Sequence, residues 1–234
     1  QFDRTIAVSE AVRRELLRFL PEDRVITIPN GIPCGEDAGS ALPAVVSPFP
    51  AGSFVLGSAG RLSPEKRFDI LIEVVRELRS RGVPATALVL GEGPEERKLR
   101  TVAGADLAEH LHFAGFQQNV GAWLGIMHVF AITSDREGLP TVLLEAWEAG
   151  CPVVSRAVGG IPDIVENGVN GALVPTGDPS AFADACETLY RDPALRDRYA
   201  EKGRAEVRTR YSSAKNARAM ERLYETIAGE KGIG

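Results

Sequence analysis

Two glutamates flank a turn that could serve either of two chemistries. In the stretch SDREGLPTVLLEAWEAGCPVV, residues 134–154, Glu137 precedes a Gly-Leu-Pro-Thr turn and Glu145 lies in the apolar segment after it. A pair of carboxylates is typical of acid/base catalysis. A Gly-Pro turn that opens a helix is typical of anion binding, because backbone N–H groups point outward there. The two interpretations predict different enzymes.

The turn favours the anion interpretation. A proline such as Pro140 is common at the start of a helix, although it has no N–H of its own. The backbone amides around Gly138, Leu139 and Thr141 should therefore face a ligand at the mouth of the helix. The segment predicts a site for a phosphate or carboxylate group.

Glu145 is expected on the same side of this helix. On a helical wheel it shares a narrow polar stripe with Thr141 and Glu148, one turn below the mouth. A carboxylate there can accept two hydrogen bonds from a vicinal diol, such as a ribose. The alternatives are an exposed helix face for Glu145 and a favourable position in the helix dipole for Glu137.

A second loop, AGRLSPEK at residues 59–66, carries two cations. Ser63 followed by Pro64 predicts a helix start, with the Ser63 hydroxyl as its cap. Arg61 and Lys66 then lie near a helix N-terminus, where a cation costs about 0.3–1 kcal/mol. A bound anion, above all a phosphate, would explain both. The alternative is that exposed side chains tolerate this cost in water.

A third loop, GEGP at residues 91–94, contains Gly91 and Gly93. A Gly-x-Gly after a strand is a weak indication of a dinucleotide fold here, because the third glycine is replaced by Pro94. The two glycines do allow a ligand to approach the backbone closely.

The predicted helices and strands indicate where these loops lie relative to one another. Over residues 53–190 short apolar strands alternate with amphipathic helices, which indicates a doubly wound, Rossmann-like α/β domain with a parallel sheet of about six strands. Ligands of such sheets bind beyond the carboxyl ends of the strands. The loops at 59–66, 91–94, 115–119, 134–140 and 156–161 should therefore share one edge.

The rest of the chain is divided by composition. Residues 1–34 predict a strand–helix–strand, 35–52 are rich in Gly and Pro and predict a linker, and 191–234 predict two polar helices. The first residue is Gln, which favours a piece of a longer chain. Residues 191–222 hold ten Lys or Arg and five Asp or Glu, which indicates either solvated helix faces or docking on an acidic or membrane surface.

Composition excludes several classes of protein. The net charge of −5 argues against a general nucleic-acid binder, and no apolar run approaches the ~20 residues of a membrane span. Three scattered cysteines form neither a disulfide framework nor a CxxC zinc motif, so a cytoplasmic location is expected. Cys151 is most simply a small core residue.

Taken together, these stretches resemble a known family. EGLPTVLLEA, with GRLSPEKRFDILIE, LVLGEGPEERKL, HFAGFQQNV, PVVSRAVGGIPDIVENGVNGALVP and VITIPNGI in the same order, is similar to glycosyltransferase family 4 of the GT-B superfamily. The resemblance covers nearly the whole chain.

The resemblance implies a role for each residue. Arg61 and Lys66 would hold the diphosphate of a sugar donor, Glu137 would contact its sugar and Glu145 its ribose. Phe116 and Gln117 would lie at the edge of the nucleobase. The sugar-phosphate pocket would be lined by backbone groups of Gly138, Leu139, Pro140 and Thr141. Close approach of the donor to the backbone would be allowed by Gly60, Gly91 and Gly93. The implied reaction retains the anomeric configuration, needs no metal or other cofactor, and uses a UDP- or GDP-linked sugar.

The sequence departs from the family pattern in places. Asp163 stands where the family often has Glu, and Met127 and His128 stand where small residues are usual; His128 is expected to be a packing residue. Family enzymes have two domains, so a first domain that binds the acceptor (a lipid, a polysaccharide or a small glycoside) is expected to be missing. Residues 1–34 would be a remnant of that domain with the interdomain strand, and the helices at 191–234 would pack back toward it. Peripheral membrane contact is expected only for the full-length enzyme. Two alternatives are a nucleotide-sugar epimerase or hydrolase on the same scaffold, and a non-enzymatic nucleotide-binding module.

Overall fold

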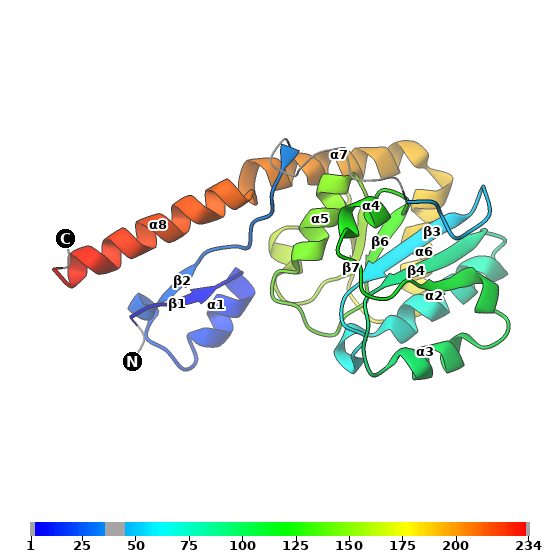
Figure 1. Cartoon of the computed structure of the whole chain (residues 1–234), viewed down its shortest axis with the longest axis horizontal. Coiled ribbons are helices and arrows are strands. Elements are labelled where there is room, and N and C mark those ends of the chain that lie inside the picture. The colour runs from blue at the N-terminus through cyan, green and yellow to red at the C-terminus, as the bar shows by residue number, and fades with distance from the viewer. Residues whose placement is uncertain (1–2, 36–44, 233–234) are drawn as a thin grey trace.

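A six-stranded parallel sheet forms the centre of the protein. The computed structural model describes residues 3–35 and 45–232 (Figure 1). The strand order is β5-β4-β3-β6-β7-β8, and all neighbours are parallel. The strands are β3 (Phe54–Ala59), β4 (Ala85–Leu90), β5 (Leu111–Phe113), β6 (Val129–Ile132), β7 (Val153–Arg156) and β8 (Gly171–Val174). The doubly wound sheet expected from the sequence is confirmed.

The strand order reverses between β3 and β6. From β3 the chain winds through β4 to β5 on one side, and it then returns to add β6, β7 and β8 on the other. Such a reversal leaves a crevice beyond the carboxyl ends of the two central strands. The position of the site therefore follows from topology.

Helices cover both faces of the sheet because successive strand residues point to opposite sides. In β3, Phe54 and Leu56 belong to one buried cluster, and Val55 belongs to the other. The first cluster includes α2 (Phe68–Ser80), α3 (Glu96–Ala103) and α6 (Pro179–Arg191). The second includes α4 (Val120–Leu124), α5 (Thr141–Ala149) and α7 (Pro193–Arg210).

The two C-terminal helices have different neighbours. The α7 helix packs on α5, where a Cβ on Gly203 would lie 2.3 Å from Cδ1 of the buried Trp147. The α8 helix (Ser213–Glu230) extends beyond the sheet and lies beside the N-terminal segment (Figure 1). The α8 helix therefore extends along the N-terminal segment, whereas most of α7 packs on the sheet domain.

The N-terminal segment forms the expected strand–helix–strand: β1 (Thr5–Ala7), α1 (Glu10–Leu16) and β2 (Val25–Thr27). The two strands pair in parallel as a sheet of their own. Its contacts with α8 include ion pairs from Arg4 to Glu230 at 2.6 Å and from Lys231 to Asp3 at 2.8 Å. These pairs bring the two ends of the described chain together.

Some local predictions differ from the structure. The helix start expected at Ser63 is a single 3₁₀ turn at Pro64–Lys66, and the residues after the loop at 156–161 form another at Ile161–Asp163. Within the predicted linker, residues 36–44 lie outside the described residues. None of the helices that the structure describes is both long and apolar enough to cross a bilayer.

Candidate functional site

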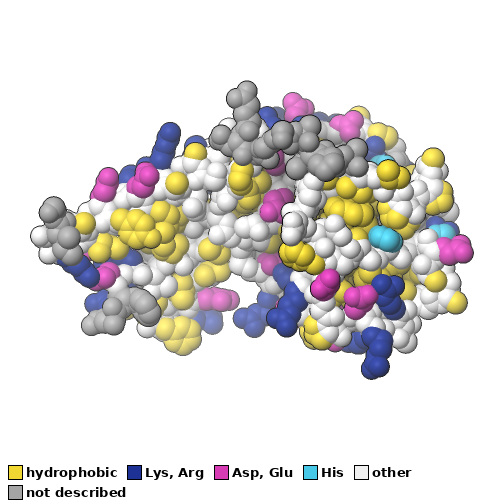
Figure 2. Space-filling view, viewed as in Figure 1, with side chains coloured by type: hydrophobic (Ala, Val, Ile, Leu, Met, Phe, Trp, Pro, Cys, Tyr) yellow, Lys and Arg dark blue, Asp and Glu magenta, His cyan; other side chains and the backbone are white. Residues whose placement is uncertain are grey.

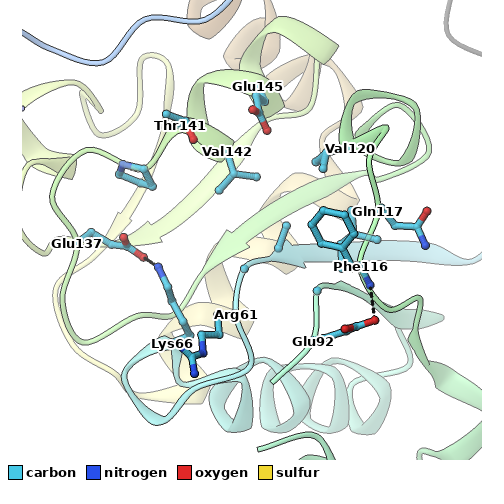
Figure 3. Close-up of a pocket in the computed structure, with 15 residues that line it drawn as sticks. Arg61, Lys66, Glu92, Phe116, Gln117, Val120, Glu137, Thr141, Val142 and Glu145 are labelled. Atoms are coloured by element: carbon cyan, nitrogen blue, oxygen red, sulfur yellow. Dashed lines mark hydrogen bonds and ion pairs between the residues drawn. The ribbon is translucent and has the colours of Figure 1, made fainter. Parts of the chain in front are cut away.

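A cavity of about 530 Å³ lies beyond the carboxyl ends of β3, β4 and β6 (Figure 3). Its walls come from the loops after β3, β4, β5 and β6 and from the first turns of α5. Ten of the thirteen predicted site residues line it: Gly60, Arg61, Lys66, Gly91, Phe116, Gln117, Glu137, Pro140, Thr141 and Glu145. The sheet edge therefore gathers most of the residues singled out from the sequence.

The cationic part of the cavity contains an ion pair. Lys66 Nζ lies 2.7 Å from Glu137 Oε1, and the side chains are 26% and 9% exposed. Arg61 is exposed and forms no salt bridge with any residue that the structure describes. An anion bound here would meet one unpaired guanidinium and one ammonium that is already held in place.

The mouth of α5 opens toward the same space. Pro140 precedes the helix, and its side chain cannot cap the N–H groups of the first turn. Thr141 and Val142 line the cavity at this point (Figure 3). Uncapped N–H groups with the positive end of the helix dipole favour a phosphate here.

Glu145 lies one turn farther along α5, and its carboxylate faces the cavity (Figure 3). The side chain is half-buried, and burial raises its pKa above the ordinary value. Glu145 therefore does not lie on an exposed helix face, the alternative that the sequence left open. A carboxylate that is partly removed from water gains more from accepting hydrogen bonds from a diol.

Replacing Glu145 with glutamine should stabilise the fold at pH 7 by on the order of 0.5 kcal/mol and have no effect near pH 4. Because its folded-state pKa is raised, the folded state binds a proton more tightly than the unfolded state. That contribution is complete below the unfolded pKa and is lost as pH rises through the folded pKa. Thermal unfolding at both pH values measures it, with exposed Glu225→Gln on α8 as control. Equal stability at pH 7 would contradict the prediction.

The loop after β5 forms the other end of the cavity. Phe116 is 70% exposed, so its ring is available for stacking. Gln117 has a structural role: its Nε2 donates to the Ala114 carbonyl at 2.6 Å, and its Oε1 accepts from Trp123 Nε1 at 3.0 Å. Gln117 therefore lines the cavity as predicted, but these polar atoms already have partners within the protein.

Three predicted residues do not line this cavity. Gly93 packs on the preceding loop, where a Cβ would lie 2.4 Å from the Leu62 carbonyl oxygen. Leu139 is buried, and its carbonyl accepts from Asn30 Nδ2 at 2.8 Å. Gly138 borders a second hollow on the far side of Glu137.

The second hollow separates the sheet from the N-terminal segment. It is lined by Val12 and Glu15 of α1 on one side and by Lys66, Arg136 and Glu137 on the other. The space-filling view shows dark blue Lys and Arg side chains gathered between these two parts of the molecule (Figure 2). The Lys66–Glu137 pair thus forms a wall between two hollows.

Two expected side-chain contacts are replaced by others. The Ser63 hydroxyl does not cap a helix but donates to Glu65 Oε1 at 2.5 Å. Glu148 pairs with Arg208 of α7 at 2.8 Å, so the predicted polar stripe of α5 is divided between the cavity and a helix–helix contact. For Glu148 the partner comes from another helix, whereas for Ser63 it lies two residues away in the same turn.

Glu92 lines the cavity but was not predicted to do so. Its Oε1 accepts from the Phe116 N–H at 3.3 Å, which links the loops after β4 and β5. Its position between Gly91 and Gly93 in the third loop could have indicated that it lines the site.

Gly159 and Gly160, in the loop after β7, support the turn that carries Glu137. A Cβ on Gly159 would lie 1.6 Å from the Glu137 carbonyl oxygen, and Gly160 N–H donates to the Gly138 carbonyl at 2.8 Å. The adjacent glycines could have indicated this close approach.

The remaining candidates have packing roles. His128 Nδ1 accepts from the Val55 N–H at 3.0 Å, and burial lowers the pKa of the ring, as expected for a packing residue. Cys151 is fully buried, which agrees with the core position expected for it, and burial raises the pKa of its thiol.

Within residues 3–35 and 45–232, no group of His, Cys, Asp and Glu is arranged to hold a metal ion.

Comparison with known sequences gives a consistent result. The family model described as "Glycosyl transferases group 1" matches residues 44–206. The chain is 33% identical over 226 residues to phosphatidyl-myo-inositol mannosyltransferase of Mycobacterium leprae, covering 95% of this chain and 59% of that protein. It is 37% identical over 156 residues to the lipopolysaccharide core biosynthesis glycosyltransferase LpsE of Rhizobium meliloti, covering 66% and 44%. The chain thus spans about half the length of these two relatives.

Solved structures show the same fold. HepE of Anabaena, in complex with UDP and glucose, superposes with a TM-score of 0.81 at 24% identity, covering 95% of this chain and 63% of that one. Sucrose-phosphate synthase of Thermosynechococcus elongatus has a TM-score of 0.81 at 22% identity, covering 98% and 59%. At this identity the similarity concerns the fold, which is the GT-B arrangement expected from the motifs.

Proposed function

This chain belongs to the group 1 glycosyl transferases, as its motifs predicted, and from that premise we propose that its cavity binds the nucleoside-diphosphate part of a sugar donor. The observation that carries the proposal is the convergence of three features in one space of about 530 Å³. They are the Arg61–Lys66 cationic wall, the uncapped mouth of α5, and the carboxylate of Glu145. The first two match the diphosphate, and the third matches the ribose.

The proposed roles follow from chemistry. Lys66 and Arg61 hold the diphosphate, together with the first-turn amides of α5. Glu145 accepts hydrogen bonds from the ribose diol, and the exposed ring of Phe116 stacks on the base. Glu137 positions the donor sugar. Its carboxylate lies 2.7 Å from the Lys66 ammonium, and it would therefore lie beside the diphosphate to which the sugar is attached.

The proposed reaction is transfer of a hexosyl group from a UDP- or GDP-linked donor, with retention at the anomeric carbon. The bond between that carbon and the diphosphate oxygen breaks, and the leaving oxygen takes up the developing negative charge. Lys66, Arg61 and the α5 amides stabilise that charge in a preorganised site. We propose that this positive charge replaces a metal ion.

The acceptor is expected to bind elsewhere. Because the chain spans about half the length of its relatives, we propose that the acceptor binds mainly to the region of such enzymes that lies outside the part matched here. By analogy with the mannosyltransferase, whose name specifies a phosphatidyl-inositol acceptor, lipid-linked acceptors deserve testing first. We propose a cytoplasmic location with peripheral membrane contact.

Calorimetric titration with UDP and with GDP tests the proposal. We expect micromolar binding of one of them, unchanged by EDTA, and about five- to tenfold weaker binding of its 2′-deoxy analogue, because one hydrogen bond to a carboxylate is lost. Glu145→Gln should reduce that difference, whereas Glu225→Gln should not. Absence of binding to both nucleotides would refute the proposal. Release of free sugar from the donor without an acceptor would favour a hydrolase or epimerase instead.

A further inference from the structure

One carboxylate outside the cavity ties together the two loops that carry Lys66 and Glu137. Asp135 follows β6 and precedes Glu137 by two residues, but it does not line the cavity. Its backbone N–H donates to the Glu65 carbonyl at 2.8 Å, one residue before Lys66. The Asp135–Glu65 bond thus lies close in the chain to both partners of the ion pair.

The Asp135 side chain is shared by two arginines. Arg67, which directly follows Lys66, places Nη1 3.4 Å from both carboxylate oxygens. Arg156, at the end of β7, donates from its own Nη1 to Asp135 Oδ1, and its side chain is more buried than that of Arg67. A single carboxylate therefore connects the loops that follow β3, β6 and β7.

The residue between Lys66 and α2 is held in a costly conformation. Arg67 has φ 50° and ψ 44°, and within the described residues it is the only non-glycine at positive φ. For a residue with a side chain this left-handed conformation costs about 1–2 kcal/mol. Arg67 is kept there by Asp69, at 2.9 Å, and by Asp135. The position of Lys66 is thus fixed by contacts made by its neighbour.

The network also includes the backbone of Lys66. The Thr133 hydroxyl, buried at the end of β6, donates to the Lys66 carbonyl at 3.0 Å. Burial alone would raise the pKa of Asp135, but the hydrogen bonds from Arg156 and Arg67 outweigh it and lower the pKa. Asp135 is therefore a carboxylate at neutral pH, and its ion pairs persist there.

We propose that Asp135 is a positioning residue for the diphosphate site, acting through Arg67 and Arg156 on the loops that present Lys66 and Glu137. The inference rests on the proposed function and deepens it. Without the carboxylate, Arg67 can relax and Lys66 can move relative to Glu137, and small displacements of such groups have large effects. The ribose and base would lie over Glu145 and Phe116, which belong to other elements.

This separation defines the experiment. Titrations followed by NMR compare UDP with uridine, or GDP with guanosine where GDP is the ligand, in the wild-type chain and in Asp135→Asn. We expect the diphosphate affinity to fall about tenfold while the nucleoside affinity stays the same. Asp106→Asn is the matched control, since it removes an equal charge from an ion pair with Arg76 at 3.0 Å in another part of the fold. It should leave both affinities unchanged.

A second variant removes another member of the same ion-pair network, Arg156 at the end of β7. Arg156→Gln should reproduce the selective loss of diphosphate affinity. Combining it with Asp135→Asn should add little, because both substitutions remove the same Arg156–Asp135 ion pair. Equal diphosphate affinity in wild type and both single variants, or a proportional loss for the nucleoside, would overturn the inference while leaving the proposed function intact. A wild-type chain that binds neither UDP nor GDP would overturn the proposed function and this inference with it.

Discussion

Replacing Lys66 with alanine is expected to lower the affinity for UDP or GDP by roughly 30- to 100-fold, the value of a strong charge-assisted hydrogen bond to phosphate. The loss has two causes. The ammonium that contacts the diphosphate disappears, and Glu137, whose side chain is only 9% exposed, is left without its partner at 2.7 Å. An unpaired carboxylate at that position would repel the incoming phosphates.

Lys98→Ala is a close control for this variant. Lys98 forms an ion pair of the same length, 2.7 Å, with Glu95, but its side chain is 67% exposed and lies outside the cavity. Exposed pairs contribute about 0–1 kcal/mol, so neither affinity nor stability should change much. Calorimetry measures both variants against UDP and GDP. Equal affinities of Lys66→Ala and Lys98→Ala would show that Lys66 does not contact the diphosphate.

The double variant separates the two causes. Adding Glu137→Gln to Lys66→Ala removes the stranded charge, so thermal stability should recover toward the wild-type value. Affinity should recover only in part, because the phosphate contact is still absent. Full recovery of affinity would mean that Lys66 acts only by neutralising Glu137.

Gly159→Ala is expected to destabilise the fold by about 3 kcal/mol or more, which corresponds to a fall in Tm of about 6–12 °C for a chain of this size. A Cβ at this position would lie 1.6 Å from the carbonyl oxygen of Glu137, so the loop after β7 must move away from the turn. Gly159 also has φ +55°, which adds backbone strain when a side chain is present. Because the turn carries Glu137, affinity for the diphosphate should fall as well.

Gly168→Ala isolates the steric part of this effect. Gly168 has φ +82°, but a Cβ there would meet no atom within 4 Å. Its replacement should therefore cost only the conformational penalty, about 1 kcal/mol, and should leave nucleotide affinity unchanged. Thermal unfolding measures the two variants side by side. Similar losses of stability would mean that the loop after β7 yields freely and does not support the Glu137 turn.

Most of the fold could be predicted because its signals are local. Helices such as α2 and α6 have the amphipathic period, and buried strands such as β4 are continuous apolar runs, so their alternation over residues 53–190 could be recognised from the sequence. Short helices and turns were less well defined, as at Pro64–Lys66 and Ile161–Asp163, where each forms only one turn of 3₁₀ helix. A single turn has too few residues to show a period.

Much of the candidate site could also be predicted, because a parallel sheet brings the carboxyl ends of its strands to one edge whatever the details of the loops. Arg61, Lys66, Glu137 and Glu145 line one cavity for that reason. Comparison with known families then assigned the chain to the group 1 glycosyl transferases, which the ordered motifs had predicted.

What the tertiary structure decided is the partner of each side chain. From the sequence, Glu137 and Glu145 formed a pair of carboxylates; in the structure Glu137 binds Lys66, 71 residues away in the chain, while Glu145 faces the cavity. Likewise, Gln117 was assigned to the base and is bonded to Ala114 of its own loop and to Trp123 of α4. Asp135, which no motif marked, connects the loops that follow β3 and β6 with the end of β7. Sequence patterns record which residues lie on a common face or edge, because backbone geometry repeats locally. Hydrogen bonds and ion pairs instead depend on ångström-scale distances between segments that only the complete fold brings together.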